Sequence, residues 1–352
     1  MPSPAAVALA AARLLRSMRS RLELVTDSAI RDVLGSGWGL RVDDLRYHPE
    51  GGGAYHWIAH TDDDRRWFVT GDDLDTKPWL GTDRASVFEG LVHAYRTAAD
   101  LQYAGLSFVV APVLTMAGSP AERLDERHAV SVFEYVVGEP GRWGQALSTG
   151  AAVELVTTLA RLHGAPPALC RNVRLGFEVP GRDELEAALA ALDRPWDGGP
   201  LSEPARHELA GHATMVVESL AALDHFAPLL DDAGQAAVVT HGEPHPANLI
   251  ETATGHKLID WDTVALARRE RDLWMLDGID HDLLDTYREL TGGTLDAGAL
   301  AAYRLLWQLA DIAAFVAQLR RPHRDDDDAE HALTALRSLF GGDEPAPYGV
   351  RR

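Results

Sequence analysis

The stretch from His241 to Asp262 constrains this chain most, because it places polar side chains on either side of a short predicted hairpin. Prolines at 244 and 246 prevent a regular helix through the loop that comes first. The next residues read as two short strands, 249–250 and 258–259, joined by a turn. A tight hairpin of this kind brings Asn248 close to Asp260, although twelve positions separate them.

The spacing of these polar residues resembles the catalytic and metal-binding loops of the aminoglycoside phosphotransferases, whose pattern is H-G-D-x-x-x-x-N followed by I-D-x-D/E. Here the pattern reads His241-Gly-Glu243, Asn248 and then Asp260-Trp-Asp262. In phosphoryl transfer a carboxylate orients the attacking hydroxyl, while an amide and a second carboxylate hold magnesium on the nucleotide phosphates. The resemblance covers most of the chain from about residue 40. It implies an α+β, bilobal, protein-kinase-like fold with a β-rich N-lobe and a mostly helical C-lobe.

The resemblance also implies a role for each residue of the pattern. Glu243 would accept or orient the acceptor hydroxyl, and His241 would fix the catalytic loop through hydrogen bonds to the backbone. Asn248 and Asp260 would ligate Mg²⁺, an ion that prefers oxygen ligands and keeps waters. Asp262 would either contribute to a second magnesium ion or anchor the loop, and both readings stay open.

One residue departs from the pattern, because Glu243 stands where the family usually has aspartate. Glutamate keeps the carboxylate but adds a methylene group, which moves the oxygens by about one bond length. A misplacement of about 1 Å can cost on the order of a hundredfold in rate. Either a loop shaped by the flanking prolines compensates for the longer side chain, or activity is low.

The first part of the chain has the pattern of a small β-rich lobe. Strands are predicted over 40–47, 55–59 and 66–69, and a glycine turn, Gly51-Gly52-Gly53, separates the first two. The nucleotide-binding lobe of the resembled family begins in the same order, and glycines let the backbone approach phosphates closely. Gly51, Gly52 and Gly53 are therefore candidate nucleotide-binding residues, with a plain hairpin turn as the alternative.

The family carries a phosphate-gripping lysine on its third strand, but this chain has Thr70 at that place. Lys77 is the only lysine in this lobe and is the candidate for the role, with Arg66, or no residue, as alternatives. A helix is predicted over 82–101 from its apolar spacing. Glu89 on this helix is the candidate partner of the lysine, with a solvated surface acid as the alternative.

Two more buried strands are predicted, over 108–112 and 129–137. The second resembles the hinge strand that closes such lobes, which implies that adenine pairs with backbone groups near Glu134 to Val136. The β-rich lobe would then occupy residues 1–137, with a helix at its start, and the helical catalytic and acceptor-binding lobe residues 138–352.

The second lobe is expected to be mostly helical. Arg271-Asp272-Leu273 follows the metal-binding loop, and the resemblance implies that Asp272 braces the catalytic loop from beneath with its carboxylate on backbone amides. The apolar periodicity predicts the longer helices of this lobe over 151–163, 183–192, 208–224 and 303–319.

Composition limits the partners of the chain. A net charge of −20 argues against binding nucleic acid or anionic membranes. It suits both a cationic substrate such as an amino sugar and simple solubility. A single cysteine among 352 residues excludes an intrachain disulfide and fits a reducing cytoplasm. No stretch approaches ~18–20 apolar residues, so no membrane span is expected. Separately, the chain is expected to be a monomer or a homodimer.

These patterns predict an ATP- and Mg²⁺-dependent O-phosphotransferase. It would transfer the γ-phosphoryl group to a hydroxyl of a small polar molecule such as an aminocyclitol, an aminoglycoside or an amino sugar. GTP in place of ATP stays open. The alternative is a catalytically weak or inactive kinase-like nucleotide-binding protein, which the substituted acid at 243 and the missing strand lysine would favour.

Overall fold

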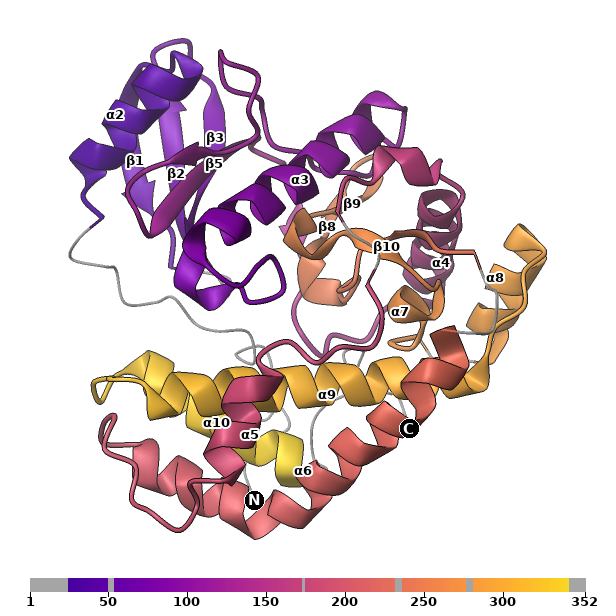
Figure 1. Ribbon diagram of the computed structural model, residues 1–352. Helices are drawn as coiled ribbons and strands as arrows, with labels where there is room; N and C mark the ends of the chain where they lie inside the picture. The colour runs from indigo at the N-terminus through magenta and orange to yellow at the C-terminus, as the bar shows by residue number, and fades with distance from the viewer. Residues whose placement is uncertain (1–24, 50–53, 173–174, 232–235, 277–280, 342–352) are drawn as a thin grey trace.

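A computed structural model of the chain describes residues 25–49, 54–172, 175–231, 236–276 and 281–341 (Figure 1). In its first part, five antiparallel strands form one sheet in the order β1-β2-β3-β5-β4. The strands are β1 (Val42–Tyr47), β2 (Ala54–Thr61), β3 (Arg66–Asp73), β4 (Glu122–Arg123) and β5 (His128–Glu134). The single-turn 3₁₀ helix η1 (Leu74–Thr76) follows β3.

Two helices cover this sheet from opposite faces, α2 (Asp27–Trp38) and α3 (Arg84–Tyr103) (Figure 1). Ile30 of α2 belongs to the same buried cluster as Val130 of β5, whereas Leu91 of α3 clusters with Ala129. Neighbouring residues of a strand point to opposite faces, so the two clusters lie on either side of the sheet.

The second part is mostly helical, and it holds most of the largest buried cluster among the described residues. Its helices are α4 (Thr149–His163), α5 (Arg182–Leu189), α6 (Ser202–Asp231), α7 (Glu270–Leu273), α8 (His281–Thr291), α9 (Ala297–Arg320) and α10 (Asp327–Gly341), with the short 3₁₀ turn η2 (Pro167–Leu169). Helix α9 lies across this part and packs against α5, α6 and α10 (Figure 1).

Two small sheets carry the polar loops. Strand β7 (Val238–Thr240) pairs with β10 (Ala265–Ala267), and β6 (Glu139–Pro140) pairs with the hairpin of β8 (Leu249–Thr252) and β9 (Gly255–Leu258). The 3₁₀ turns η3 (Pro246–Asn248) and η4 (Trp261–Thr263) flank the hairpin. These small sheets lie between α3 and the helices of the second part (Figure 1).

By length and composition, α6 and α9 are each apolar enough to cross a membrane. Half of the most apolar stretch of α9 is buried, and Leu309, Ile312 and Val316 are almost fully buried. Core helices of soluble proteins pass the same test, and α9 has the packing of such a helix. The corresponding stretch of α6 is only 22% buried.

The architecture confirms the predicted α+β class, with a β-rich part followed by a mostly helical one. The first three predicted strands, the helix over 82–101 and the hairpin are present. The strand predicted over 108–112 is not formed. Val109 and Pro112 make only isolated bridges, to Leu258 and Phe133. This segment passes from one sheet to the other, and proline cannot donate to a strand ladder.

Two predicted features lie outside the described residues, namely the glycine turn at Gly51, Gly52 and Gly53 and the helix at the start of the chain. The strand predicted to end at 137 ends at Glu134. The lobe boundary between 137 and 138 remains a prediction.

Candidate active site

The backbone of the catalytic loop rests on one buried carboxylate. The amides of His241 and Gly242 donate to Asp272 at 2.8 and 2.6 Å, and His163 Nε2 donates to the same carboxylate at 3.0 Å. Burial opposes the charge of Asp272, but the hydrogen bond from His163 and the nearby Arg271 outweigh it and hold its pKa below the ordinary value. The expected hydrogen bonds between the Asp272 carboxylate and backbone amides of the loop are therefore present.

His241 makes the backbone contacts expected of it. Its Nε2 donates to the carbonyl of Ile259 at 2.9 Å, and its Nδ1 accepts from the amide of Glu243 at 3.2 Å. The ring is fully buried, and burial lowers its pKa to about 4. A neutral ring with both nitrogens engaged has no proton to exchange, so the contacts of His241 are those of a residue that positions the loop.

Gly242 occupies a conformation that only glycine adopts easily, with φ at +104°. A Cβ atom at this position would overlap the guanidinium of Arg271. That guanidinium ties the loop together, because it donates to Thr240 Oγ1 at 2.8 Å and to the carbonyl of Thr263 at 2.9 Å.

We expect Gly242→Ala to lower the free energy of unfolding by more than the ~1–3 kcal/mol of a strained backbone alone, and to remove activity. Gly105→Ala is the matched control, because Gly105 has φ of +95° but nothing within 4 Å of the added Cβ. Chemical denaturation of both variants measures the difference, which is the cost of displacing Arg271. Equal losses in the two variants would contradict this account.

The hairpin brings the predicted metal ligands together. The amide of Ile259 donates to the carbonyl of Asn248 at 3.0 Å, so Asn248 and Asp260 lie at the open end of the hairpin. Asn248 Nδ2 donates to the carbonyl of Glu243 at 2.9 Å, which leaves the carboxamide oxygen as the atom able to ligate a cation. Asp260 has φ of +63°, a rare conformation that recurs at functional sites.

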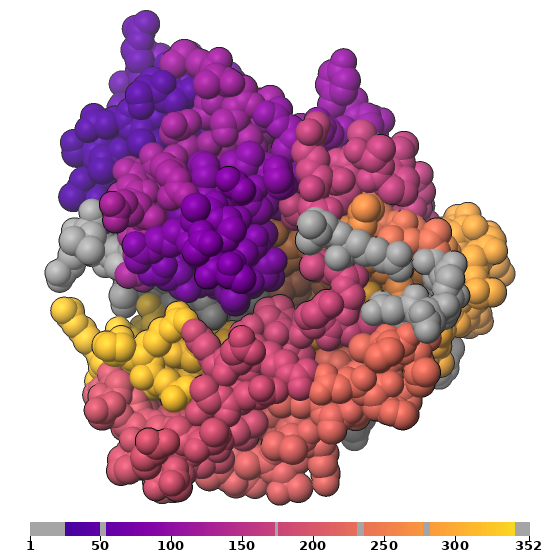
Figure 2. All heavy atoms as spheres, in the orientation of Figure 1, coloured from indigo at the N-terminus to yellow at the C-terminus, as the bar shows by residue number. Residues whose placement is uncertain are grey.

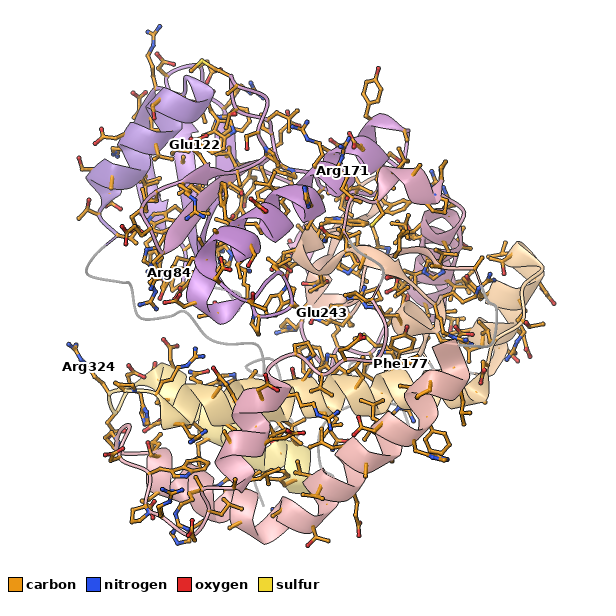
Figure 3. The ribbon with its side chains drawn as sticks, viewed as in Figure 1. Arg84, Glu122, Arg171, Phe177, Glu243 and Arg324 are labelled. Atoms are coloured by element: carbon orange, nitrogen blue, oxygen red, sulfur yellow. The ribbon has the colours of Figure 1, made fainter. Side chains whose placement is uncertain are left out.

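Several carboxylates share this small region and repel one another. Loss of surrounding water and then Asp262 raise the pKa of Asp260 well above its ordinary value, although the residue is exposed to solvent. Burial and then Asp262 likewise raise the pKa of Glu243 to about 7, although 29% of its side chain is exposed. A bound cation would relieve this repulsion. Figure 3 shows Glu243 between α3 and α9, and Figure 2 shows the surface hollowed between α3 and the helices below it.

The donor set fits magnesium. Carboxylate and carboxamide oxygens are its preferred protein ligands, and one or two carboxylates usually share the ion with substrate phosphates. Asp260, Asp262 and Asn248 provide such a set. Within the described part of the chain, no group of three or more His, Cys, Asp or Glu side chains is arranged to hold a metal alone.

Lys77 reaches this site, but its partners differ from the expected one. Its Nζ lies 2.5 Å from Asp262 Oδ2 and 3.0 Å from Asp72 Oδ1, and only 3% of its side chain is exposed. Burial favours the neutral amine, yet Asp262, Asp72 and Asp260 together raise its pKa. Glu89 is exposed on α3, and both ion pairs recorded for Lys77 are made to aspartates.

The sequence-based interpretation missed Asp72. A signal was present, because residues two apart on a strand share a face, so Asp72 lies on the face of Thr70, where the family has its lysine. Thr70 Oγ1 lies 3.4 Å from Asp72 Oδ2. Asp72 is 1% exposed at the end of β3.

The predicted hinge leaves the sheet where β5 ends. Glu134 is exposed and lies 3.3 Å from Arg65, and the amide of Tyr135 donates to the carbonyl of Arg66 at 3.3 Å. The Arg66 guanidinium also covers the Tyr135 ring at 4.1 Å. Arg66 is thus engaged at the hinge. Val136 continues this segment toward β6, and its backbone contact with adenine remains a prediction.

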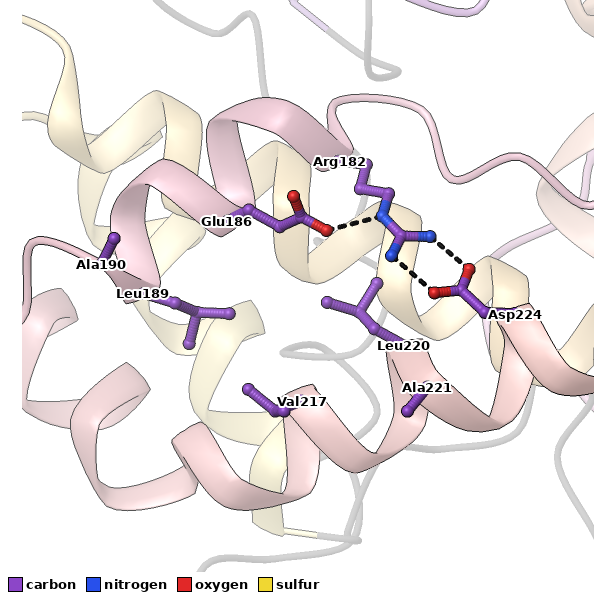
Figure 4. Close-up of a pocket in the computed structure, with 8 residues that line it drawn as sticks. All are labelled: Arg182, Glu186, Leu189, Ala190, Val217, Leu220, Ala221 and Asp224. Atoms are coloured by element: carbon purple, nitrogen blue, oxygen red, sulfur yellow. Dashed lines mark hydrogen bonds and ion pairs between the residues drawn. The ribbon is translucent and has the colours of Figure 1, made fainter.

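A separate pocket of about 440 Å³ lies between α5 and α6 (Figure 4). Arg182 lines it, and its Nε donates to Glu186 at 2.7 Å while its two terminal guanidinium nitrogens donate to Asp224. No residue of the loop or the hairpin lines this pocket. It is therefore not the place where the predicted site residues meet. Its remaining lining is mostly apolar: Leu189, Ala190, Val217, Leu220 and Ala221.

The chain is similar to known proteins over most of its length. Residues 56–315 match the model of the phosphotransferase enzyme family. Protein StrN of Streptomyces griseus is 28% identical over 274 residues, which is 73% of this chain and 78% of StrN.

Two solved structures are similar in fold. A spectinomycin phosphotransferase, in complex with ADP and spectinomycin, aligns with a TM-score of 0.69 at 14% identity over 90% of this chain and 95% of its own. An amicoumacin kinase bound to AMP-PNP, Ca²⁺ and its ligand aligns with a TM-score of 0.55 at 10% identity, covering 92% and 96%. The kinase-like bilobal fold predicted from the sequence is thus confirmed.

Proposed function

Because the chain belongs to the phosphotransferase enzyme family, a family of kinase-like small-molecule phosphotransferases, we propose that it transfers the γ-phosphoryl group of ATP to a hydroxyl of a small polar molecule. One observation carries the proposal. Glu243, Asn248, Asp260, Asp262 and Lys77 meet at one site, although Lys77 and Asp262 are 185 positions apart. This set provides an acid–base carboxylate, oxygen ligands for a cation and a buried ammonium group.

Glu243 is the residue proposed to act on the acceptor. Its carboxylate orients the hydroxyl toward the γ-phosphorus. The bond from the γ-phosphorus to the bridging oxygen breaks as the acceptor oxygen approaches, ADP leaves with that oxygen, and Glu243 takes the hydroxyl proton. In a loose transition state the proton is lost late, so Glu243 acts mainly through position. A pKa of about 7 lets it hold and release a proton near neutral pH.

The remaining side chains are proposed to bind the nucleotide and its magnesium. Asn248 and Asp260 would hold the ion, and Asp262 would hold a second ion or anchor η4. When bound, magnesium neutralises charge on the phosphate oxygens. Lys77 would contact the phosphates, and the backbone near Glu134 to Val136 would contact the base.

We propose a cationic acceptor of the amino-sugar, aminocyclitol or aminoglycoside class. The chain has a net charge of −20, and acids crowd the site. A fold neighbour of known structure holds spectinomycin, which supports the proposal without identifying the acceptor. A cytoplasmic location and a monomeric or homodimeric state belong to the same proposal.

A substrate screen tests the function. Purified protein is incubated with MgATP or MgGTP and a panel of aminocyclitols, hexosamines, aminoglycosides and neutral sugars, and nucleoside diphosphate release is measured. One acceptor should stimulate release well above the rate without acceptor, and mass spectrometry should find its mass increased by one phosphoryl group. Nucleotide binding without turnover on the whole panel would instead support a catalytically inactive nucleotide-binding protein.

The pKa of Glu243 predicts a pH dependence. The ionised form of Glu243 is the active one, and burial raises the pKa of Glu243 from 4.5 to about 7. The parameter kcat/KM for MgATP reports the pKa values of the nucleotide-free enzyme. It should therefore reach its maximum above pH 7 and fall about tenfold per pH unit below pH 7. The same measurement on Glu243→Gln should lose this acidic limb. A limb that persists unchanged in the variant would assign the titration to another group.

A further inference from the structure

The ammonium group of Lys77 is delivered to the site from a loop. Lys77 follows the 3₁₀ turn η1, so no strand pairing fixes its backbone, and φ and ψ of −119° and 62° place it outside regular structure. A buried ammonium group needs paired charges to stay charged. Its position therefore depends on the carboxylates that hold it, and two of them are within 3.0 Å.

The two carboxylates differ in whether they have a second proposed role besides binding Lys77. Asp262 lies in η4 beside Asp260 and belongs to the proposed magnesium site, so a bound ion would compete with Lys77 for it. Asp72 has no such second task. It lies on β3, where it pairs with Ala54 of β2 and Ala129 of β5, and only 1% of it is exposed. Asp72 is thus the more rigidly held partner, although the shorter contact of Lys77, a hydrogen bond of 2.5 Å, is made to Asp262.

We propose that Asp72 is the positioning residue for the nucleotide-binding lysine of this enzyme. It holds Lys77 at the phosphate site from strand β3, in place of the helix acid Glu89. This inference rests on the proposed function, because it assumes that Lys77 contacts the nucleotide phosphates. Without Asp72, Lys77 would remain bound to Asp262 alone. The ammonium group of Lys77 would then lie farther from the phosphates, and it would compete with the cation for the Asp262 carboxylate.

Isothermal titration calorimetry measures the affinity of the full chain for ADP and for MgADP, and it tests the inference without any acceptor. Lys77→Met should weaken binding by about 10- to 150-fold, the equivalent of a charged hydrogen bond. Asp72→Asn should weaken it by at least about tenfold, and more strongly for MgADP than for ADP. The double variant should bind like Lys77→Met, because Asp72 acts only through Lys77. Asp72→Glu should bind more tightly than Asp72→Asn.

Asp73→Asn is the matched control. Asp73 is the next residue of the same strand and is equally buried, but it pairs with Arg127 at 2.6 and 2.9 Å. Asparagine also keeps its hydrogen bond to the amide of Asp75. The control should lower the melting temperature, because it removes the ion pair with Arg127, and leave nucleotide affinity within about twofold. Glu89→Gln should change neither quantity.

The outcomes separate the inference from the function. Wild-type affinity in Asp72→Asn, with weakened binding in Lys77→Met, would overturn the role of Asp72 alone. An absence of nucleotide binding in the wild type would overturn both. Should Asp72→Asn fail to fold, the double variant decides, because weaker binding than in Lys77→Met would contradict an action solely through the lysine.

Discussion

Replacing Asp260 by asparagine should abolish turnover and leave the fold intact. Asparagine tolerates the left-handed conformation that Asp260 adopts at φ of +63°, so the backbone of the turn should not change. The lost charge is the one on which the proposed magnesium site depends. Removing a single group that stabilises the reacting charge costs about 10²–10³ in kcat, and we expect at least this loss.

The same change should not cost stability. Loss of surrounding water and then the charge of Asp262 raise the pKa of Asp260, so the folded protein disfavours the ionised carboxylate. A raised carboxyl pKa means that the ionised group destabilises the folded state as the pH rises through its unfolded value. Asparagine removes this cost. The melting temperature at pH 7 should therefore equal or exceed that of the wild type, while activity is lost.

Asp64→Asn is the control, since Asp64 is an exposed aspartate in the turn after β2 with φ of +62°. It should keep full activity and a normal melting curve. Nucleotide titrations with and without magnesium complete the test, because Asp260→Asn should lose the gain in affinity that magnesium gives the wild type. Unchanged turnover in a folded Asp260→Asn protein would remove Asp260 from the metal site.

The central hairpin could be predicted from sequence because its determinants are local. The prolines of the loop, the turn at Gly255 and the short apolar strands lie within about twenty residues of one another. Their pairing, from Leu249 with Leu258 to Thr252 with Gly255, follows from this short-range pattern. The brace by Asp272 could be expected only from the resemblance, since a spacing of 31 residues from His241 says nothing about contact.

The environment of Lys77 could not be predicted in the same way. Its partner Asp262 is 185 positions away, and the contact depends on how α3 and η4 pack between the two parts of the molecule. The family pattern favoured Glu89, which is a helix acid at a plausible spacing. The helix turns that side chain to solvent, and the strand supplies Asp72 instead.

Glu243→Gln should lower kcat by about 10²–10⁴, the usual effect of losing a general base, because glutamine keeps the size and removes the charge. Removing a carboxylate that burial and Asp262 disfavour should leave the melting temperature unchanged or higher. Glu251→Gln is the control, since Glu251 is an exposed acid on the hairpin and lies outside the site. Steady-state rates with the acceptor found in the screen provide the measurement.

Glu243→Asp is the sharper test, because it restores the residue that the family usually carries. The backbone of Glu243 is held from both sides: its amide donates to His241 Nδ1 at 3.2 Å, and its carbonyl accepts from Asn248 Nδ2 at 2.9 Å. The loop cannot follow a shorter side chain without breaking one of these bonds. The aspartate carboxylate would therefore withdraw from the acceptor by about one bond length, and the variant should be slower than wild type by up to about a hundredfold.

A faster aspartate variant would mean that the loop is not adapted to glutamate and that Glu243 limits the enzyme. Unchanged turnover in both Glu243→Gln and Glu243→Asp would remove Glu243 from the chemistry. Asp262 would then be the next carboxylate to test, because it raises the pKa of Glu243 and so lies close to it. Its ion pair with Lys77 argues against that role, since the ammonium group at 2.5 Å already occupies one of its carboxylate oxygens.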